Sequence, residues 1–275
     1  MRFDAKEAGA AFRLAGFRDV DASADPRAFI GYLDRVAADL APMVGRGLDL
    51  LRLTPGGKVL DVGCGSCALL PALAARVGPG GRIAGIDPSR SLVAEARRRV
   101  AKSGVPAQIE LGDAVALPYG DGVFDAARAD RVLMFVPDAG KAVSELARVT
   151  RPGGRVVVTE GDQGAAIVDG EWEATCPILA TACHEFANPW IGRALRRHFV
   201  AAGLRDIECE MLPAISTSFA EWSRRLGIVD TTDRAVASGR LSRAAADAWL
   251  DSLRERDRRG QFFAASVFFV VSATK

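Results

Sequence analysis

Glycines and acidic residues recur at three places in the first half of the chain, in a pattern suited to a polar ligand. The string V-L-D-V-G-C-G-S at residues 59–66 contains Gly63 and Gly65 at an expected strand-to-helix junction. Glycines there let the backbone pass close to a ligand, and the following helix offers free N–H groups. Asp87 follows about 22 residues after Gly65, and Asp113 stands about 26 residues further on. An acid at the first place can bind both ribose hydroxyls, and one at the second can accept a hydrogen bond from an adenine amino group.

The surrounding sequence must place these residues side by side. Strands are expected at 59–62, 82–86, 108–111, 124–129 and 155–159, with helices between them at 68–76, 89–103 and 140–150. Strands that alternate with helices indicate a parallel sheet covered on both faces. The three candidate positions then follow the carboxyl ends of adjacent strands, so they fit one adenosine-containing ligand.

Two features distinguish between adenosine ligands. The dinucleotide-binding pattern G-x-G-x-x-G places a pyrophosphate at the helix start, but the string from Gly63 reads G-C-G-S-C-A and lacks the third glycine. Asp61 would repel a phosphate and would suit the ammonium of an amino acid. These features point to S-adenosylmethionine rather than to a dinucleotide.

Four segments resemble the class I S-adenosylmethionine-dependent methyltransferases: V-L-D-V-G-C-G-S, I-D-P-S, G-D-A and R-V-T-R-P-G-G-R-V-V-V-T-E. More closely, the chain resembles the branch that contains the ubiquinone and menaquinone methyltransferases and many bacterial natural-product methyltransferases. The resemblance covers roughly residues 30–275. It departs from the family at Cys67, where relatives usually have glycine, and at Met134 and Phe135, where many relatives have a histidine.

The resemblance implies an α/β fold with a Rossmann-like, seven-stranded, mostly parallel sheet, an antiparallel last strand and helices on both faces. We expect an N-terminal helical lid segment at 1–53 and a cofactor-binding core at 54–161. Residues 162–275 are expected to complete the sheet and to carry inserted lid helices over the acceptor.

The resemblance also implies a set of cofactor contacts. The helix with Tyr32 folds over the cofactor in this branch, and the loop at Asp130 and Arg131 passes its methionine part; core packing and surface pairing are the respective alternatives. The expected cofactor-binding residues are Tyr32, Asp61, Gly63, Cys64, Gly65, Asp87, Pro88, Asp113, Ala114, Asp130 and Arg131.

Acceptor chemistry depends on the segments after residue 160. His184 is the candidate catalytic base, with a plain surface histidine as the alternative; the other candidate bases are Glu160, Asp162 and His198. Trp172 and Trp190 are candidates for acceptor binding, with core packing as the alternative. The implied reaction is methyl transfer to a small secondary metabolite, quinone-like or aromatic acceptor, at oxygen, carbon or nitrogen. A cyclase that keeps the cofactor as a structural ligand, and a macromolecular methyltransferase, remain alternatives.

Composition and charge limit the binding partners that we expect. The 275 residues are 49% hydrophobic and 25% charged, with a net charge of +2, so electrostatics give no reason to expect nucleic acid or a membrane as the main partner. We see no signal peptide or spanning segment. The odd count of five cysteines favours reduced thiols in a cytoplasmic protein. We expect no metal site, because Cys64 and Cys67 fit the glycine turn, and we expect a monomer or homodimer.

Overall fold

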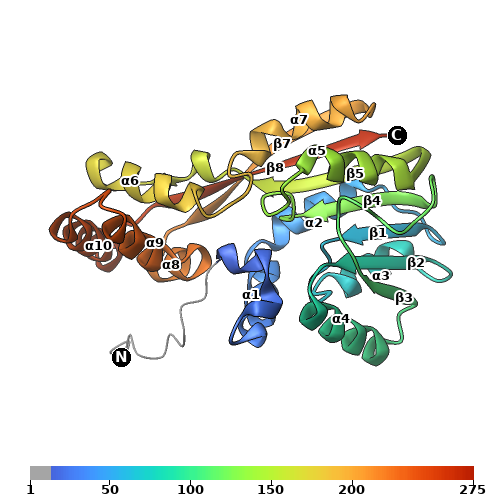
Figure 1. Cartoon of the computed structure of the whole chain (residues 1–275), viewed down its shortest axis with the longest axis horizontal. Helices are drawn as coiled ribbons and strands as arrows, with labels where there is room; N and C mark the ends of the chain where they lie inside the picture. The colour runs from blue at the N-terminus through green and yellow to red at the C-terminus, as the bar shows by residue number, and fades with distance from the viewer. Residues whose placement is uncertain (1–13) are drawn as a thin grey trace.

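The computed structural model describes residues 14–275, which form an eight-stranded sheet with helices on both faces (Figure 1). The strand order is β3-β2-β1-β4-β5-β8, and β7 pairs with β8 beyond that path. The strands are β1 (Lys58–Val62), β2 (Arg82–Asp87), β3 (Ala107–Leu111), β4 (Phe124–Asp130), β5 (Thr150–Gly161), β6 (Ile167–Val168), β7 (Arg205–Ser216) and β8 (Ala264–Thr274). The first five run parallel and β8 runs antiparallel to β5. The predicted fold class is confirmed; the eighth strand is the two-residue β6.

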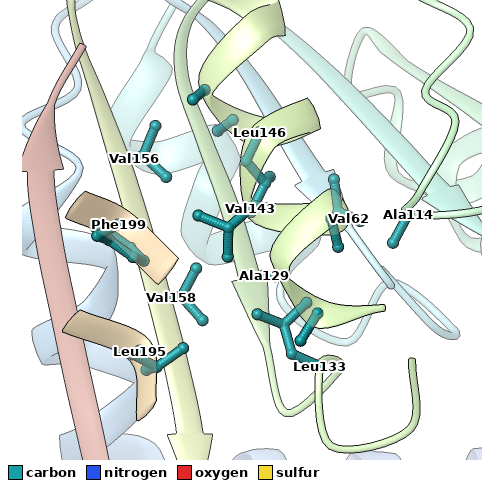
Figure 2. Packing of buried hydrophobic residues seen from close by; sticks show 14 of the residues in the cluster. Val62, Ala114, Ala129, Leu133, Val143, Leu146, Val156, Val158, Leu195 and Phe199 are labelled. Atoms are coloured by element: carbon teal, nitrogen blue, oxygen red, sulfur yellow. The ribbon is translucent and has the colours of Figure 1, made fainter. Parts of the chain in front are cut away.

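Helices cover the two faces of the sheet in separate layers. They are α1 (Pro26–Asp39), α2 (Ala41–Leu50), α3 (Leu70–Val77), α4 (Arg90–Ser103), α5 (Ala139–Val149), α6 (Trp172–Cys183), α7 (Ile191–Ala201), α8 (Phe219–Leu226), α9 (Ile228–Ala237) and α10 (Arg243–Arg258). On one face α5 and α7 pack against β4 and β5, where Leu195 and Phe199 adjoin Val156 and Val158 (Figure 2). Helices α2, α3 and α4 form the core of the other face.

Helix ends follow sequence signals that position the ligand-facing edge. Asp25 caps α1 through the N–H of Arg27, and Pro26 occupies the first turn. Ser89 caps α4 by accepting from Leu92 N, and Gly104 ends it in the left-handed conformation. The start of α4 therefore lies directly after β2.

A long ribbon carries the helices that follow β5. Strands β7 and β8 pair from Arg205 with Thr274 to Ser216 with Ala264, whereas β5 pairs with β8 only as far as Gly161 with Phe268. The ribbon extends beyond the parallel sheet towards α6, α8, α9 and α10 (Figure 1). These four helices share a hydrophobic cluster of their own, the lid cluster, which includes the buried Trp222 and Trp249.

No helix within residues 14–275 is long and apolar enough to cross a bilayer.

Candidate active site

A cavity of about 270 Å³ lies at the carboxyl ends of β1, β2, β3 and β4. Loops after these strands line one side, and residues from α1, α8 and the segment before α1 line the other. Nine of the eleven predicted cofactor residues line it: Tyr32, Gly63, Gly65, Asp87, Pro88, Asp113, Ala114, Asp130 and Arg131. The sheet thus brings together residues that are nearly 100 positions apart in the chain.

The glycine turn after β1 requires glycine at two positions. Gly63 and Gly65 have positive φ angles of 69° and 53°. A Cβ on Gly63 would lie 2.2 Å from Val132 Cγ2, and one on Gly65 would lie 2.8 Å from Leu33 Cδ1. The turn therefore offers bare backbone between the loop after β4 and helix α1, as a closely approaching ligand needs.

Asp87 at the end of β2 joins this turn to the start of α4. Its carboxylate accepts hydrogen bonds from Gly65 N at 2.9 Å and from Ser89 N at 2.9 Å. Burial raises the pKa of Asp87 to about 6, although both hydrogen bonds favour the charged form. A carboxylate has about four acceptor positions, so two N–H bonds leave it able to accept from ribose hydroxyls.

Asp113 and Ala114 follow β3 on the same edge. The Gly112 N–H donates to the Asp87 carbonyl at 3.1 Å, which holds this loop beside the ribose position. Asp113 also accepts from Val115 N at 3.1 Å. This is the local turn expected of an aspartate in a loop, and it is compatible with exposure of the second oxygen to the cavity.

A chain of buried ion pairs lies beneath the cavity. Arg128 of β4 donates to Asp61 at 3.3 Å and to Asp130 at 2.8 Å, and Arg131 donates to Asp130 at 2.8 Å. Arg128 is 1% exposed. The two arginines lower the pKa of Asp130 against the effect of burial, whereas burial prevails at Asp61 and raises its pKa.

Two predicted cofactor residues do not line the cavity. Asp61 is buried against Arg128, so its carboxylate has an internal cation where we expected a ligand ammonium. The side chain of Cys64 faces the sheet, because a Cβ on Gly85 would lie 2.9 Å from its Sγ. This arrangement does not support direct contact between a ligand and the side chain of Asp61 or Cys64.

Tyr32 connects the two sides of the cavity. Its hydroxyl donates to the backbone carbonyl of Arg225 in α8 at 3.3 Å. Burial raises its pKa to about 12, and the Arg131 and Arg225 cations offset only part of that effect. The hydroxyl therefore stays protonated at neutral pH and acts as a donor.

Aromatic rings form a continuous wall in the same cavity. Phe17 lies 5.7 Å from Tyr32 and 5.6 Å from Phe135, and Phe135 lies 5.6 Å from Phe186, between ring centroids. All four rings line the cavity. We call them the aromatic wall; such rings pack well against a flat apolar molecule.

The residues predicted for acceptor chemistry lie elsewhere. Trp172 is 69% exposed and Trp190 is 56% exposed, and neither lines the cavity. His184 is exposed at the end of α6 and also lies outside it. The lid helices bury Trp222 and Trp249 in their own core instead, where Trp249 Nε1 donates to Thr175 Oγ1 at 2.9 Å. Trp172, Trp190 and His184 are therefore not brought together with the predicted cofactor residues in this cavity.

Among the remaining candidate bases, the buried Asp162 forms an ion pair at 2.6 Å with Arg193, whose side chain is largely exposed. Glu160 is 0% exposed, and one oxygen accepts from Val132 N at 2.8 Å and from Leu133 N at 2.5 Å. Its second oxygen has no hydrogen-bond partner among the described residues. Burial raises the pKa of Glu160 to about 8. Glu160 therefore acts as a positioning residue for the loop that carries Arg131 and Val132 to the cavity.

The titration of Glu160 predicts how stability depends on pH. The folded protein keeps its proton up to about pH 8, whereas the unfolded chain releases it near the ordinary value of 4.5. The folded state then binds more protons, so rising pH destabilises it across this window. Glu160→Gln retains an acceptor oxygen and removes the titration. We expect the variant to be more stable than wild type at pH 8 by about 1–3 kcal/mol, with a gap that narrows towards pH 5.

Urea unfolding at both pH values measures this gap. Glu173→Gln, at an exposed position on α6, is the matched control and should not alter the pH dependence. Equal stability of wild type and Glu160→Gln at pH 8 would contradict the assignment.

Residues 14–275 contain no group of three or more histidine, cysteine, aspartate or glutamate side chains placed to hold a metal ion. All five cysteines are free thiols.

Comparison with known proteins agrees with this geometry. A family model described as a methyltransferase domain matches residues 60–158. A Streptomyces fradiae protein, described as an uncharacterized 37.1 kDa protein in transposon TN4556, is 37% identical over 89% of this chain and 70% of the relative. Demethylmenaquinone methyltransferase of Bacillus cytotoxicus is 38% identical over 43% of this chain and 50% of that protein. Nocamycin O-methyltransferase of Saccharothrix syringae is 37% identical over 43% of this chain and 42% of that protein.

The alignments thus span half or less of the two named methyltransferases. The crystal structure of the YcgJ protein from Bacillus subtilis superposes with a TM-score of 0.59 at 18% identity, over 86% of this chain and 98% of that chain. This likeness supports the fold. Sequence and fold together show that the chain belongs to the class I S-adenosylmethionine-dependent methyltransferases.

Proposed function

We propose that this protein transfers the methyl group of S-adenosylmethionine to a small, flat and largely apolar acceptor. The observation that carries this proposal is the position of the aromatic wall, which lines the same cavity as the glycine turn and Asp87. One side of the cavity suits adenosine, and the other suits an aromatic or quinone-like ring. The names of the two methyltransferase relatives support acceptors of this kind.

The residues present fit the cofactor. The bare backbone at Gly63 and Gly65 would pass its methionine part, Asp87 would accept from the ribose hydroxyls, and Asp113 would accept from the adenine amino group. When bound, S-adenosylmethionine supplies an electrophilic methyl group whose sulfonium leaving group becomes a neutral thioether without protonation.

The protein then contributes orientation and exclusion of water rather than proton transfer. Neither His184 nor His198 lines the cavity, and the Tyr32 hydroxyl keeps its proton at neutral pH. The aromatic wall and α1 surround the acceptor, so its nucleophilic atom is held in line with the methyl group. We propose that the core at 54–161 holds the cofactor and that α1 and α8 determine the choice of acceptor.

Transfer of a labelled methyl group tests the proposal. Purified protein is incubated with methyl-tritiated S-adenosylmethionine and a panel of phenols and hydroxyquinones, and organic extracts are analysed by chromatography and mass spectrometry. Label in a small-molecule product supports the proposal. Tight cofactor binding with no transfer in any fraction indicates the cyclase-type alternative, and label in acid-precipitated RNA or protein indicates a macromolecular substrate.

Turnover should be insensitive to metal removal. Displacement at a sulfonium needs no Lewis acid, because the leaving group carries no developing negative charge. We expect the rate in excess EDTA to stay within about twofold of the untreated rate. This is a small effect, because a tenfold change in rate corresponds to about 1.4 kcal/mol of activation free energy. Loss of turnover that magnesium or zinc restores would contradict this mechanism.

A further inference from the structure

Arg225 is a half-buried arginine whose charge has no carboxylate partner within residues 14–275. It lies near the end of α8 and lines the cavity beside Tyr32 and Leu226. Its Nη2 donates to the Ala214 carbonyl at 3.3 Å and to Ser216 Oγ at 3.0 Å. Its Nε is buried without a hydrogen-bond partner, and it forms no ion pair within residues 14–275.

Other buried arginines show what a purely structural role looks like. Arg128 and Arg131 pair with carboxylates. Arg155 has no carboxylate partner, but Nε, Nη1 and Nη2 each donate to a different acceptor. At Arg225 both hydrogen bonds come from Nη2, and Nη1 makes no hydrogen bond within residues 14–275.

Partial burial makes the lack of a nearby carboxylate unfavourable for the Arg225 cation. Burial lowers the pKa of Arg225, and the charges of Asp39 and Glu221 offset this only from a distance. A guanidinium remains charged even so, and a charge that is partly removed from water without an opposite charge nearby is unfavourable. A carboxylate in the cavity would accept a charge-assisted hydrogen bond from Nη1 and supply the missing negative charge.

We propose that Arg225 binds a carboxylate, or a comparable oxyanion, on the acceptor. This inference rests on the proposed function and narrows the substrate class to flat molecules that carry an acidic oxygen group. The aromatic wall contacts the ring and Arg225 fixes its orientation. Arg18, an exposed residue that also lines the cavity, adds positive charge where the acidic group enters.

The experiment compares matched acids and amides. The full chain is saturated with S-adenosylhomocysteine and titrated by calorimetry with benzoate against benzamide, and with 2-naphthoate against 2-naphthamide. We expect at least one acid to bind about tenfold or more tightly than its amide, which is the effect of a charge-assisted pair. Arg225→Gln should abolish the preference, whereas Arg224→Gln, at the exposed neighbouring position, should retain it.

Separate readouts keep the outcomes distinct. Equal affinity for acid and amide in wild type, or a preference that survives Arg225→Gln, overturns the inference. Weaker binding of S-adenosylhomocysteine to Arg225→Gln also overturns it, because Arg225 would then hold the carboxylate of the cofactor. If wild type itself fails to bind S-adenosylhomocysteine, the proposed function fails instead. If circular dichroism shows that Arg225→Gln is unfolded, Arg225→Lys and the wild-type comparison decide.

Discussion

Asp87→Ala is expected to weaken binding of S-adenosylmethionine by about 10- to 150-fold. The variant removes a charged acceptor for two ribose hydroxyls, and hydrogen bonds to charged groups contribute about 1.5–3 kcal/mol. It also removes the partner of Gly65 N, so the glycine turn loses one of its supports. Isothermal titration calorimetry with the methyl donor and with S-adenosylhomocysteine measures the effect directly.

The pH dependence of binding gives a second readout. Because the pKa of Asp87 is about 6, the wild-type site loses its negative charge as the pH falls through that value. Cofactor affinity should therefore decline below pH 6 in wild type and change little in Asp87→Ala. Asp251→Ala, an exposed control on α10, should bind like wild type. Unchanged affinity in Asp87→Ala would remove this residue from the ribose, and preferential binding of NAD would refute the cofactor assignment altogether.

Arg128→Met is expected to cost about 3–5 kcal/mol of folding stability. The change leaves Asp61 buried without its cation and deprives Asp130 of one of two partners. Breaking one side of a buried ion pair is destabilising because the remaining charge stays out of water. Urea unfolding at pH 7 should show a much lower midpoint than that of wild type.

Two comparisons identify the cause of that loss. Without Arg128 the folded-state pKa values of Asp61 and Asp130 both rise, so the penalty applies at high pH and falls as these carboxylates protonate. The deficit at pH 5 should thus be smaller than at pH 7, and adding Asp61→Asn should recover part of it. Arg151→Met breaks a more exposed pair with Asp125 and should cost about 0–1 kcal/mol. A loss below about 1 kcal/mol in Arg128→Met would show that the buried pairs are not needed.

The parallel half of the fold could be predicted because each signal there is local. Short apolar runs identified β1 to β5 to within a few residues, apart from an earlier start for β5. The lid helices were expected without bounds, and no clear sequence signal indicated α6 and α9. Pro177 interrupts the pattern of the first, and the second starts directly at Gly227, which also ends α8.

The site divides in the same way. Cofactor residues are predictable because a strand end and a short loop fix them, so sequence spacing reports spatial position. The aromatic wall and Arg225 come from α8 and four other segments, and no sequence spacing predicts that they meet. Trp172 and Trp190 were named as candidates from residue type alone. Residue type does not distinguish an exposed ring from a ring that lines a cavity, whereas burial does.

The β7–β8 ribbon separates the lid helices from the parallel strands. Its outer end, from Pro213 to Ser216 opposite Ala264 to Val267, lies past the last hydrogen bond to β5. From this end of β7 the chain runs through α8, α9 and α10 around the lid cluster before it returns in β8. Insertions or exchanges in these helices leave every hydrogen bond of the parallel strands in place. Natural selection, or a designer who grafts a foreign lid onto the ribbon, can therefore change the lid helices without altering the carboxyl ends of the parallel strands.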